Sequence, residues 1–296
     1  MKLTVQIVTR NDESTIEKTI NSLLPHNPEI LIGDMNSQDK TVSLCKKYPV
    51  KIKQYSFLDY GRVRNDLNKE SSNYLKLFMF GNEEVYSGLE EVKEGYTSIL
   101  SSKYLSKEYR VYTNQGFKNQ VFECVSYKSD AFNNLVIFRH DKFDEVEKLM
   151  ILDDWKKKDP INPIINYYEA LILFSMKKYE QFINMCNNYF FIVNDNSLPS
   201  VMLRYYYAMA YFIKNMPLES LQNIVICLAA KPTMAEFWCL AGDVYHYLYD
   251  NKRAAMELYQ NALVLGKYRM NNDDYPMELA KYDDYPTQML ARLTSS

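Results

Sequence analysis

Acidic and small polar side chains gather where an apolar run of the sequence ends. The run Ile30-Leu31-Ile32-Gly33 stops at Asp34, and the polar turn that follows carries Ser37 and Asp39 ahead of a helical segment. A carboxylate at the C-terminal end of a parallel strand lies in the crevice where α/β sheets bind ligands, and it accepts hydrogen bonds from a base or a ribose. Ser37 and Asp39 are placed to cap the helix that follows. The sequence therefore predicts a nucleotide pocket at this strand end.

A β-sheet would position these acidic groups, and the sequence pattern in the first half of the chain predicts such a sheet. Short strand-like runs alternate there with helical segments, which is the pattern of an α/β fold. One helical segment is amphipathic, with Ile16, Ile20, Leu23 and Leu24 on one face. The expected strands after residue 29 are Ile30–Gly33, Val50–Tyr55, Tyr74–Phe80, Arg110–Thr113, Gln120–Tyr127 and Leu135–Phe138.

Four segments together resemble the family 2 glycosyltransferases, which are inverting nucleotide-sugar enzymes of the GT-A fold. The turn from Asp34 to Thr41 is similar to their Asp-x-x-Ser-x-Asp-x-Thr element, and Thr4–Glu13 resembles their first strand and its acidic loop. Asp59–Asn65 resembles the element before their third helix, and Tyr74–Phe80 resembles the strand that leads to their metal motif. The resemblance implies a Rossmann-like mixed sheet that binds a nucleoside diphosphate sugar, with a UDP-sugar as the expected donor.

The resemblance also assigns the donor-binding residues, and several have a structural alternative. Asp34 is the expected contact to the nucleotide, although it also suits a cap of the turn that follows it. Asp12 fits either the pocket or the start of a helix. A guanidinium offers bidentate donors to phosphate, so Arg64 is expected at the diphosphate or the ribose, with a surface helix residue as the alternative. The full donor-binding set is Thr9, Asn11, Asp12, Asp34, Asp39, Arg64 and Asn65.

The metal motif of the family is altered in this chain. Where the family carries Asp-x-Asp after the strand, the sequence reads Phe80-Gly81-Asn82-Glu83-Glu84. The family aspartates face a divalent cation that neutralises the donor diphosphate, whereas Phe cannot ligate a metal and the Asn amide is a neutral ligand. A reduced Mn2+ or Mg2+ site would use Asn82, Glu83 and His140, the last because the resemblance places a metal-binding histidine there. The alternatives are acidic residues that open a helix, for Glu83, and a structural histidine, for His140.

The chain changes character near Asp153, and the second half is helical throughout. Pro160 and Pro163 break the chain and can start the next helix. Four positions then recur 34 residues later, and small residues among them let paired helices approach closely, as in tetratricopeptide repeats. The positions are Arg204, Ala208, Tyr211 and Ser220, which recur as Trp238, Gly242, Tyr245 and Ala254. We expect an α/β domain at 1–152, an all-α tetratricopeptide-like domain at 153–270 and a tail at 271–296.

This two-domain order also resembles the bacterial peptide S-glycosyltransferases. The segment Phe117–Glu123 lies where those proteins carry His-Gly-x-Val-His-Glu, and it keeps only Val121 and Glu123. An inverting transfer needs a carboxylate that takes the proton of the acceptor. Glu123 is the expected catalytic base, with a buried salt-bridge partner as the alternative.

Composition limits the classes of function. The net charge of the 296 residues is −2, so a globally basic nucleic-acid footprint is absent. Lys46, Lys47, Lys51 and Lys53 form either a local basic patch or a solvated helix end and strand. The five cysteines share no CxxC spacing and suit reduced core thiols. No signal peptide and no run of 18 apolar residues is visible, so we expect a cytoplasmic protein with no membrane segment.

Tyrosines are dense in the second half, and Tyr205-Tyr206-Tyr207 falls within one expected helix. Aromatic residues in such repeats are more often inter-helix core than a binding surface. Consecutive side chains cannot all point inward on a helix, however, so we expect part of this set to be exposed and open to a partner. The tail carries Asp273-Asp274-Tyr275-Pro276 and then Asp283-Asp284-Tyr285-Pro286. The two motifs suit either a linear docking motif or a strap folded onto the last repeat.

Two classes of function follow from these features. One is a working glycosyltransferase that moves a sugar from a nucleoside diphosphate sugar to an acceptor recruited partly by the repeats. The other is a pseudo-glycosyltransferase, in which the donor fold is a scaffold and the repeats bind a protein partner. The retained pocket residues favour the first class, and Phe80 with Asn82 favours the second. Protein, glycan and modified nucleobase are all candidate acceptors.

Overall fold

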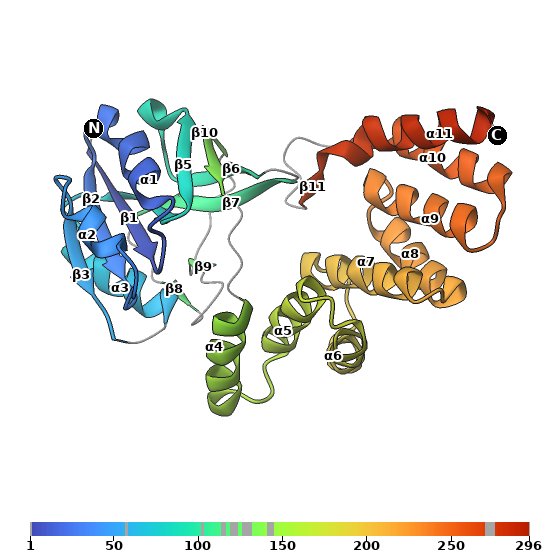
Figure 1. The fold of residues 1–296 in the computed structure, drawn as a ribbon, viewed down its shortest axis with the longest axis horizontal. Coiled ribbons are helices and arrows are strands. Elements are labelled where there is room, and N and C mark those ends of the chain that lie inside the picture. Colours follow the sequence, from blue (N-terminus) through green and yellow to red (C-terminus); the bar gives the residue numbers. More distant parts are fainter. Residues whose placement is uncertain are drawn as a thin grey trace. The chain divides into compact units, whose positions relative to one another are not determined.

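The computed structural model divides the chain into two compact units, Met1–Glu147 and Lys148–Ser296. Figure 1 shows the first, the sheet unit, as strands covered by helices, and the second, the helical unit, as successive helices. The predicted α/β class of the first and all-α class of the second are both confirmed. The structure describes residues 2–56, 59–101, 104–113, 117–118, 124–125, 132–140, 145–269 and 276–295.

The sheet unit is built on one mixed sheet. Its elements are β1 Leu3–Thr9, α1 Ile16–Leu23, η1 Leu24–His26, β2 Glu29–Asp34, α2 Thr41–Cys45, β3 Lys51–Gln54, α3 Tyr60–Glu70, β4 Leu75–Phe80, β5 Glu83–Ser87, η2 Leu89–Glu91, β6 Gly95–Leu100, β7 Tyr104–Tyr112, β8 Phe117–Lys118, β9 Cys124–Val125 and β10 Phe132–Arg139. The main strands lie in the order β3-β2-β1-β4-β7-β6-β10-β5, and β1 is parallel to both of its neighbours. A separate small sheet pairs β8 with β9.

The apolar core of the sheet unit forms because successive side chains of β1 point to opposite faces of the sheet. Leu3, Val5 and Ile7 alternate along the strand and are all fully buried. They share one cluster with Ile16 and Ile20 of α1, which confirms the amphipathic pattern predicted for that helix. This packing fixes α1 against the sheet and sets the path of the loop that joins it to β1.

Among the strands of the main sheet order, β5 and β6 lie where the sequence predicted none. Glu83 begins β5 rather than a helix, so the helix-opening alternative for this residue is wrong. Its side chain is fully buried, and β5 pairs antiparallel with β10. The segment Gly95–Leu100 forms β6, and its Tyr, Thr and Ile residues favour a strand. β6 pairs with β7 and β10.

The helical unit consists of helices joined by short turns. Its elements are α4 Glu145–Lys158, α5 Pro163–Ser175, α6 Tyr179–Ile192, α7 Leu198–Ile213, α8 Pro217–Ala230, α9 Ala235–Tyr247, α10 Lys252–Gly266, β11 Met277–Glu278, η3 Leu279–Tyr282 and α11 Asp284–Ser295, with α4 spanning the unit boundary. Pro163 is the first residue of α5, as predicted, and Asn162 caps that helix by accepting a hydrogen bond from the N–H of Ile164 over 3.1 Å. Among the helices that the structure describes, none is long and apolar enough to cross a bilayer.

Small residues bring the paired helices together, as the 34-residue repeat predicted. A Cβ atom added to Gly242 in α9 would lie 2.7 Å from the ring of Tyr259 in α10. In the preceding pair, the hydroxyl of Ser220 in α8 donates a hydrogen bond to the carbonyl of Ala208 in α7 over 2.9 Å. Close packing leaves no room for a larger side chain at these contacts. The small residues of the repeat therefore lie at the contacts between paired helices.

The inter-helix core interpretation is confirmed for the tyrosine run on α7, where only Tyr206 is partly exposed. Tyr205 and Tyr207 are buried, and Tyr206 is half-buried. The reason is that α7 packs against helices on two sides. Tyr205 contacts Phe237 of α9, and Tyr207 lies 6.4 Å, between ring centroids, from Phe182 of α6.

The C-terminal segment folds onto the last helix pair as a strap. The hydroxyl of Tyr282 donates to Oε2 of Glu236 over 2.7 Å, and the hydroxyl of Tyr285 donates to Oδ1 of Asp243 over 2.6 Å. Both acids belong to α9. The second Asp-Asp-Tyr-Pro motif thus takes the strap alternative, whereas residues 273–275 of the first lie outside the described residues.

Candidate functional site

The carboxyl ends of β2, β1 and β4 meet where the order of the strands reverses. The chain runs from β1 to β2 and β3 on one side and then places β4 on the other side of β1. Open α/β sheets bind ligands in the crevice at such a switch point. Thr9 and Asp34 are register partners at the ends of β1 and β2, and the N–H of Gly81, after β4, donates to the carbonyl of Val8 over 3.1 Å. The sheet thus brings the acidic loop, the Asp34 turn and the altered metal motif together.

The loops that follow β1 and β2 are joined by hydrogen bonds. The N–H of Asn11 donates to Oγ of Ser37 over 2.9 Å, and Oδ1 of Asn11 accepts from the N–H of Gln38 over 2.8 Å. The N–H of Glu13 donates to Oδ2 of Asp39 over 3.1 Å. Asn11 has a φ of 52°, a left-handed conformation that Asn tolerates better than most residues. The motif residues of the two loops therefore hold one another in place.

Asp34 is fully buried under this pair of loops. Its carboxylate accepts from the N–H of Ser37 over 3.2 Å and also from the hydroxyl of that residue. The cap predicted for Ser37 is therefore wrong, whereas Asp39 does accept from the N–H of Thr41 over 2.9 Å at the start of α2. Burial acts to raise the pKa of Asp39, but the hydrogen bonds it accepts, first from Thr41, outweigh burial and hold the pKa below its usual value.

Asp12 lies at the switch point and packs against the turn after β4. Its Oδ2 accepts from the hydroxyl of Thr9 over 2.7 Å. Gly81 fits beside this pair because it has no side chain, since a Cβ atom there would lie 2.5 Å from Oγ1 of Thr9 and closer still to Asp12. The carbonyl of Gly81 accepts from the hydroxyls of Thr15, the N-cap residue of α1, and Thr19 in α1, each over 2.9 Å. Asp12 and the altered metal motif thus form one packed group.

Arg64 reaches under the sheet from α3 and is fully buried, so the surface alternative for this residue is wrong. Its guanidinium donates to the carbonyl of Gln6 over 3.2 Å and to that of Met79 over 3.0 Å. The guanidinium carbon also lies 4.9 Å from the ring centroid of Phe80. In this arrangement Arg64 joins β1 to β4, whereas the resemblance places it at the donor.

The inner face of α3 is polar next to Arg64. The side-chain amide of Asn65 donates to the carbonyl of Phe117 over 2.9 Å and accepts from the N–H of the same residue over 2.7 Å. Oδ1 of Asn68 accepts from the amide of Gln6 and from the hydroxyl of Tyr112, each over 2.8 Å. Hydrogen bonds therefore fix the helix that carries two of the expected donor contacts.

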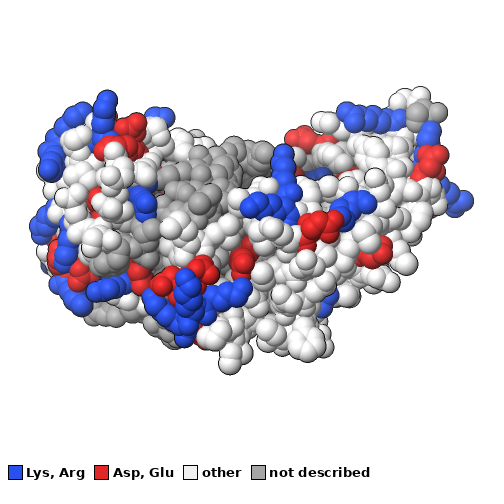
Figure 2. Space-filling view, turned by 60° about the horizontal axis from the view of Figure 1, so that its bottom comes forward, with Lys and Arg blue, Asp and Glu red and all other residues white. Residues whose placement is uncertain are grey.

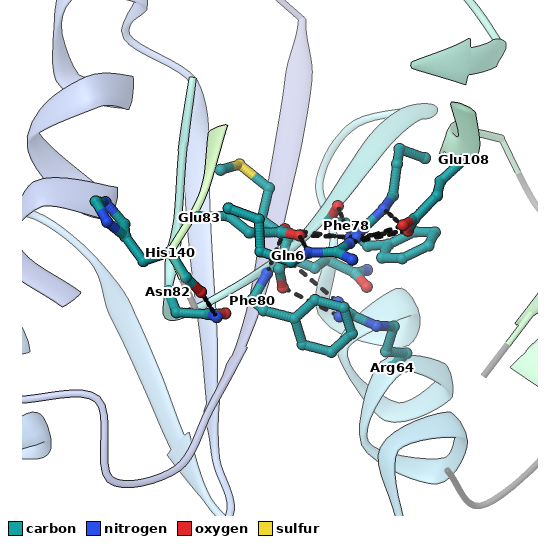
Figure 3. A network of polar contacts seen from close by, with 11 residues as sticks. Gln6, Arg64, Phe78, Phe80, Asn82, Glu83, Glu108 and His140 are labelled. Atoms are coloured by element: carbon teal, nitrogen blue, oxygen red, sulfur yellow. Dashed lines mark hydrogen bonds and ion pairs between the residues drawn. The ribbon is translucent and has the colours of Figure 1, made fainter. Parts of the chain in front are cut away.

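The side chains of the turn after β4 pack against neighbouring residues (Figure 3). The ring of Phe80 lies against the guanidiniums of Arg64 and Arg110, at 4.9 and 5.1 Å from its centroid. The amide nitrogen of Asn82 donates to the carbonyl of His140 over 2.7 Å, and the N–H of His140 donates back to the carbonyl of Asn82 over 2.9 Å. Asn82 thereby extends the pairing of β5 with β10 by one residue pair.

Glu83 follows in the turn and is bound by two arginines. Its Oε1 accepts from Nη2 of Arg110 and from Nε of Arg139, each over 2.8 Å, and its Oε2 accepts from the N–H of Phe80 over 2.9 Å. Glu108 pairs with the same two guanidiniums. Burial acts to raise the pKa of Glu108, but Arg110 and Arg139 outweigh burial and lower the pKa to about 2. Figure 3 shows this ionic cluster beside Phe80.

The arginine partners were missed from the sequence. Glu108 and Arg110 are two residues apart in β7, so period-two alternation places them on one face of the strand and offers a weak signal. Their pairing with Glu83 and Arg139 depends on β7, β5 and β10 coming together, which no local pattern encodes. The network is thus a product of sheet topology.

The residues expected to bind a metal lie at the adjoining ends of β5 and β10. Each has a partner there, and Nε2 of His140 contacts the carboxylate of Glu84 on the neighbouring strand. Within the described part of the chain, no group of three or more His, Cys, Asp and Glu side chains has the arrangement of a metal site. Glu123, the expected catalytic base, lies outside the described residues.

The lysines of the expected basic patch lie beside acids. Lys51 pairs with Glu29 at 2.8 Å, and Lys53 pairs with Asp66 at 2.6 Å. On the face drawn in Figure 2, basic and acidic side chains are interspersed over the surface. These pairs support the solvated alternative for the patch, since paired charges give a weak field for nucleic acid.

A comparison with family models adds to this geometry. Residues 4–74 match the model of glycosyl transferase family 2. The sheet unit carries a family 2 glycosyltransferase-like domain. The matched segment of this domain contains the two loops, α3 and all the expected donor contacts, and it ends before β4. A comparison with curated proteins found no match.

The helical unit was compared with solved structures. MamA from Desulfovibrio magneticus RS-1 is 15% identical with a TM-score of 0.39, and the match covers 51% of this chain and 84% of that one. The Cut9–Hcn1 hetero-tetramer of the APC/C gives 13% identity and a TM-score of 0.42, covering 50% of this chain and 26% of that one. The Sgt2 TPR domain from Aspergillus fumigatus gives 13% identity and a TM-score of 0.35, covering 45% and 77%.

Proposed function

We propose that the glycosyltransferase-like domain binds a nucleoside diphosphate sugar, with a UDP-sugar as donor, and transfers the sugar to an acceptor recruited partly by the helical unit. The observation that carries the proposal is the position of Asn11, Asp12 and Asp34 at the switch point of the sheet, where α/β folds bind ligands. The family match over residues 4–74 supports the same function. Glu123 is the proposed base, and the acceptor is a protein, a glycan or a modified nucleobase.

Recognition of the base would centre on Asp34 in this proposal. The carboxylate is fully buried, and the group that now occupies it is the hydroxyl of Ser37. A base N–H would take the place of that hydroxyl, and the turn that contains Ser37 would open to admit the ligand. Asn11 is exposed beside the turn and offers an amide for the rim of the pocket. A charge-assisted hydrogen bond to Asp34 is stronger than a neutral one, which favours the exchange.

Calorimetry of the full chain with UDP and UDP-sugars tests the proposal. We expect Asp34→Asn to weaken UDP binding by about 1–3 kcal/mol, because the charged acceptor is lost. Ser37→Ala should leave the affinity at least as strong, since the hydroxyl competes with the base. The matched control is Asp66→Asn, whose carboxylate pairs with Lys53 away from the switch point. Failure of every nucleotide to bind, or an unchanged affinity in Asp34→Asn, would refute the pocket.

A second function is favoured by the turn after β4. Phe80 and Glu83 are held by arginines rather than arranged around a cation, as a domain without transferase activity would allow. In that case the sheet unit is a pseudo-glycosyltransferase scaffold, and the helical unit binds a protein partner. Hydrolysis or transfer of a UDP-sugar by the native chain, abolished in Glu123→Gln, would decide for the enzyme. Nucleotide binding with no turnover on any acceptor class would decide for the scaffold.

A further inference from the structure

We infer that the turn after β4 holds no divalent cation, and that Arg139 supplies the fixed positive charge for a diphosphate bound beside it. The part that concerns Arg139 rests on the proposed nucleotide function. The part that concerns the metal rests on the turn alone, so the two parts have separate tests.

The first position of the altered motif has no oxygen to offer. Phe80 places a ring there, and the guanidiniums of Arg64 and Arg110 lie against it. Mg2+ and Mn2+ are hard cations that prefer carboxylate, carbonyl and water oxygens. A divalent ion at this position would therefore meet an apolar ring backed by guanidiniums and would find no oxygen ligand from this side chain.

The carboxylate of Glu83 is fully engaged. A carboxylate has about four lone-pair directions, and four donors point at this one. Arg110 donates to Oε1 over 2.8 Å and to Oε2 over 3.2 Å, Arg139 donates to Oε1 over 2.8 Å, and the N–H of Phe80 donates to Oε2 over 2.9 Å. A cation could bind Glu83 only by displacing a buried arginine.

The remaining candidates leave too few ligands. The amide nitrogen of Asn82 donates to the carbonyl of His140, which leaves Oδ1 as the one ligand atom of that side chain, and Nε2 of His140 contacts Glu84. Glu84 and His140 are 31% and 25% exposed, so this pair is the part of the turn that a cation can reach. One carboxylate, one imidazole and one amide oxygen fall short of the oxygen-rich shell that Mg2+ requires. Replacement of His140 is therefore the control for a residual site.

Arg139 is the arginine of the cluster with a partly exposed side chain. Its side chain is 32% exposed, whereas that of Arg110 is 0% exposed. Nε binds Glu83 and Nη2 binds Glu108, so the group is held in one orientation. Among the described residues, Nη1 of Arg139 carries no hydrogen bond and is available to a phosphate oxygen. A fixed, oriented guanidinium suits phosphate recognition, because little conformational entropy is lost on binding.

Manganese titration of the full chain, followed by electron paramagnetic resonance with and without UDP, tests the metal part. We expect no saturable binding by the native chain in either condition. The variant that combines Phe80→Asp with Asn82→Asp is the positive control and should gain at least about tenfold in Mn2+ affinity, because it restores anionic ligands. Saturable binding by the native chain that is lost in His140→Ala would overturn the inference and place a cation at Glu84 and His140.

Calorimetry with UDP and with uridine tests the part that concerns Arg139. We expect UDP affinity to be equal in EDTA and in Mn2+, and Arg139→Gln to weaken UDP about tenfold or more while uridine binding is unchanged, because only UDP carries phosphate. A purely structural role would weaken both ligands together and would refute the assignment. UDP binding that requires Mn2+ would overturn the inference but leave the proposed function intact. Absence of UDP binding in both buffers would instead refute the proposed function and the role of Arg139, with the manganese titration still deciding the metal part.

Discussion

Both units bury acidic side chains, and two of these acids, Glu83 and Asp243, differ in the partners that surround them. In the sheet unit, Glu83 and Glu108 are bound by arginines. In the helical unit, Asp243 accepts hydrogen bonds from the hydroxyls of Tyr259 and Tyr285, over 2.7 and 2.6 Å. A guanidinium brings a compensating charge, whereas a hydroxyl brings only a hydrogen bond. These residues are all acids, so their partners determine how burial changes the pKa of each one.

The directions of the pKa shifts follow this difference. Burial acts to raise the pKa of Glu108, yet Arg110 and Arg139 lower it to about 2. Burial raises the pKa of Asp243, and the charge of Lys281, followed by the hydrogen bonds of Tyr285 and Tyr259, reduces that shift without reversing it. The pKa of Glu236 is also raised by burial, although Arg269 lies 3.5 Å away. Two guanidiniums thus outweigh burial at Glu108, whereas burial outweighs the partners of Asp243 and Glu236 and leaves a charge there costly.

Removal of an arginine from the sheet unit should cause the largest loss of stability. Arg110→Met leaves Glu83 buried with one fewer charged partner, and we expect the sheet unit to lose about 3–5 kcal/mol of unfolding free energy. Urea denaturation, with hydrogen exchange to resolve β4 and β5, measures the loss. The control is Arg253→Met, which breaks an exposed pair with Glu257 and should cost less than about 0.5 kcal/mol. A cost below about 1 kcal/mol in Arg110→Met would mean that Arg139 alone suffices as the charged partner of Glu83.

The same contrast explains which features the sequence could predict. Asp34 ends an apolar run, and α1 shows helical periodicity, so both follow from neighbouring residues. Glu83 binds Arg110 and Arg139, which are distant in sequence and meet only through the order of the strands. Local patterns carry no information on such a meeting. The helix-opening interpretation of Glu83 was wrong for this reason.

The buried tyrosines illustrate the same limit in the helical unit. Helical geometry places Tyr205, Tyr206 and Tyr207 on different sides of α7, and this much is local. Their burial depends on helices packed on both sides of α7, which is a tertiary property. The predicted repeat of small residues succeeded because it describes a contact between consecutive helices, as at Gly242.

A second prediction extends the comparison from charge to packing. Gly81→Ala would push a methyl group into Asp12 and Thr9, so we expect a loss of about 1–3 kcal/mol and weaker nucleotide binding. Gly266→Ala is the matched change in the helical unit, where the added Cβ would lie 3.0 Å from the ring of Tyr282. A movable ring yields more easily than a fixed loop, so this variant should cost less. Equal losses of unfolding free energy in the two variants, measured by thermal or urea unfolding, would mean that the Tyr282 ring yields no more easily than the loop around Gly81.

A smaller effect should separate the pH responses of the two units. The raised pKa of Asp243 means that its contribution to stability is fully present below the unfolded pKa and is lost as the pH rises through the folded value. Asp243→Asn keeps an oxygen for the tyrosines but removes the charge. We expect it to stabilise the helical unit by about 1 kcal/mol at pH 8 and to flatten its pH dependence. Urea unfolding at pH 5 and pH 8 measures both.

Glu108→Gln is the mirror-image control in the sheet unit. The lowered pKa of Glu108 gives stability that is present above the ordinary value of 4.5 and is lost as the pH falls toward about 2. The amide should therefore destabilise at neutral pH and have little effect near pH 2. Destabilisation by Asp243→Asn together with stabilisation by Glu108→Gln would reverse the comparison.

The smallest effect is expected at Asp39, an acid that is only half-buried. One of its oxygens accepts from the N–H of Thr41 and the other accepts from the N–H of Glu13, over 2.9 and 3.1 Å. Asp39→Asn turns one oxygen into a donor, so the side chain can serve one of these amides but not both. We expect a loss of about 0.5–1 kcal/mol, because one hydrogen bond near the surface is broken. Hydrogen exchange should show faster exchange at only one of the two amides. Unchanged protection at both amides would mean that Asn11 and Ser37 alone hold the loops. The identity of the hydrogen-bond partner would then affect stability only for acids buried as deeply as Glu83 or Asp243.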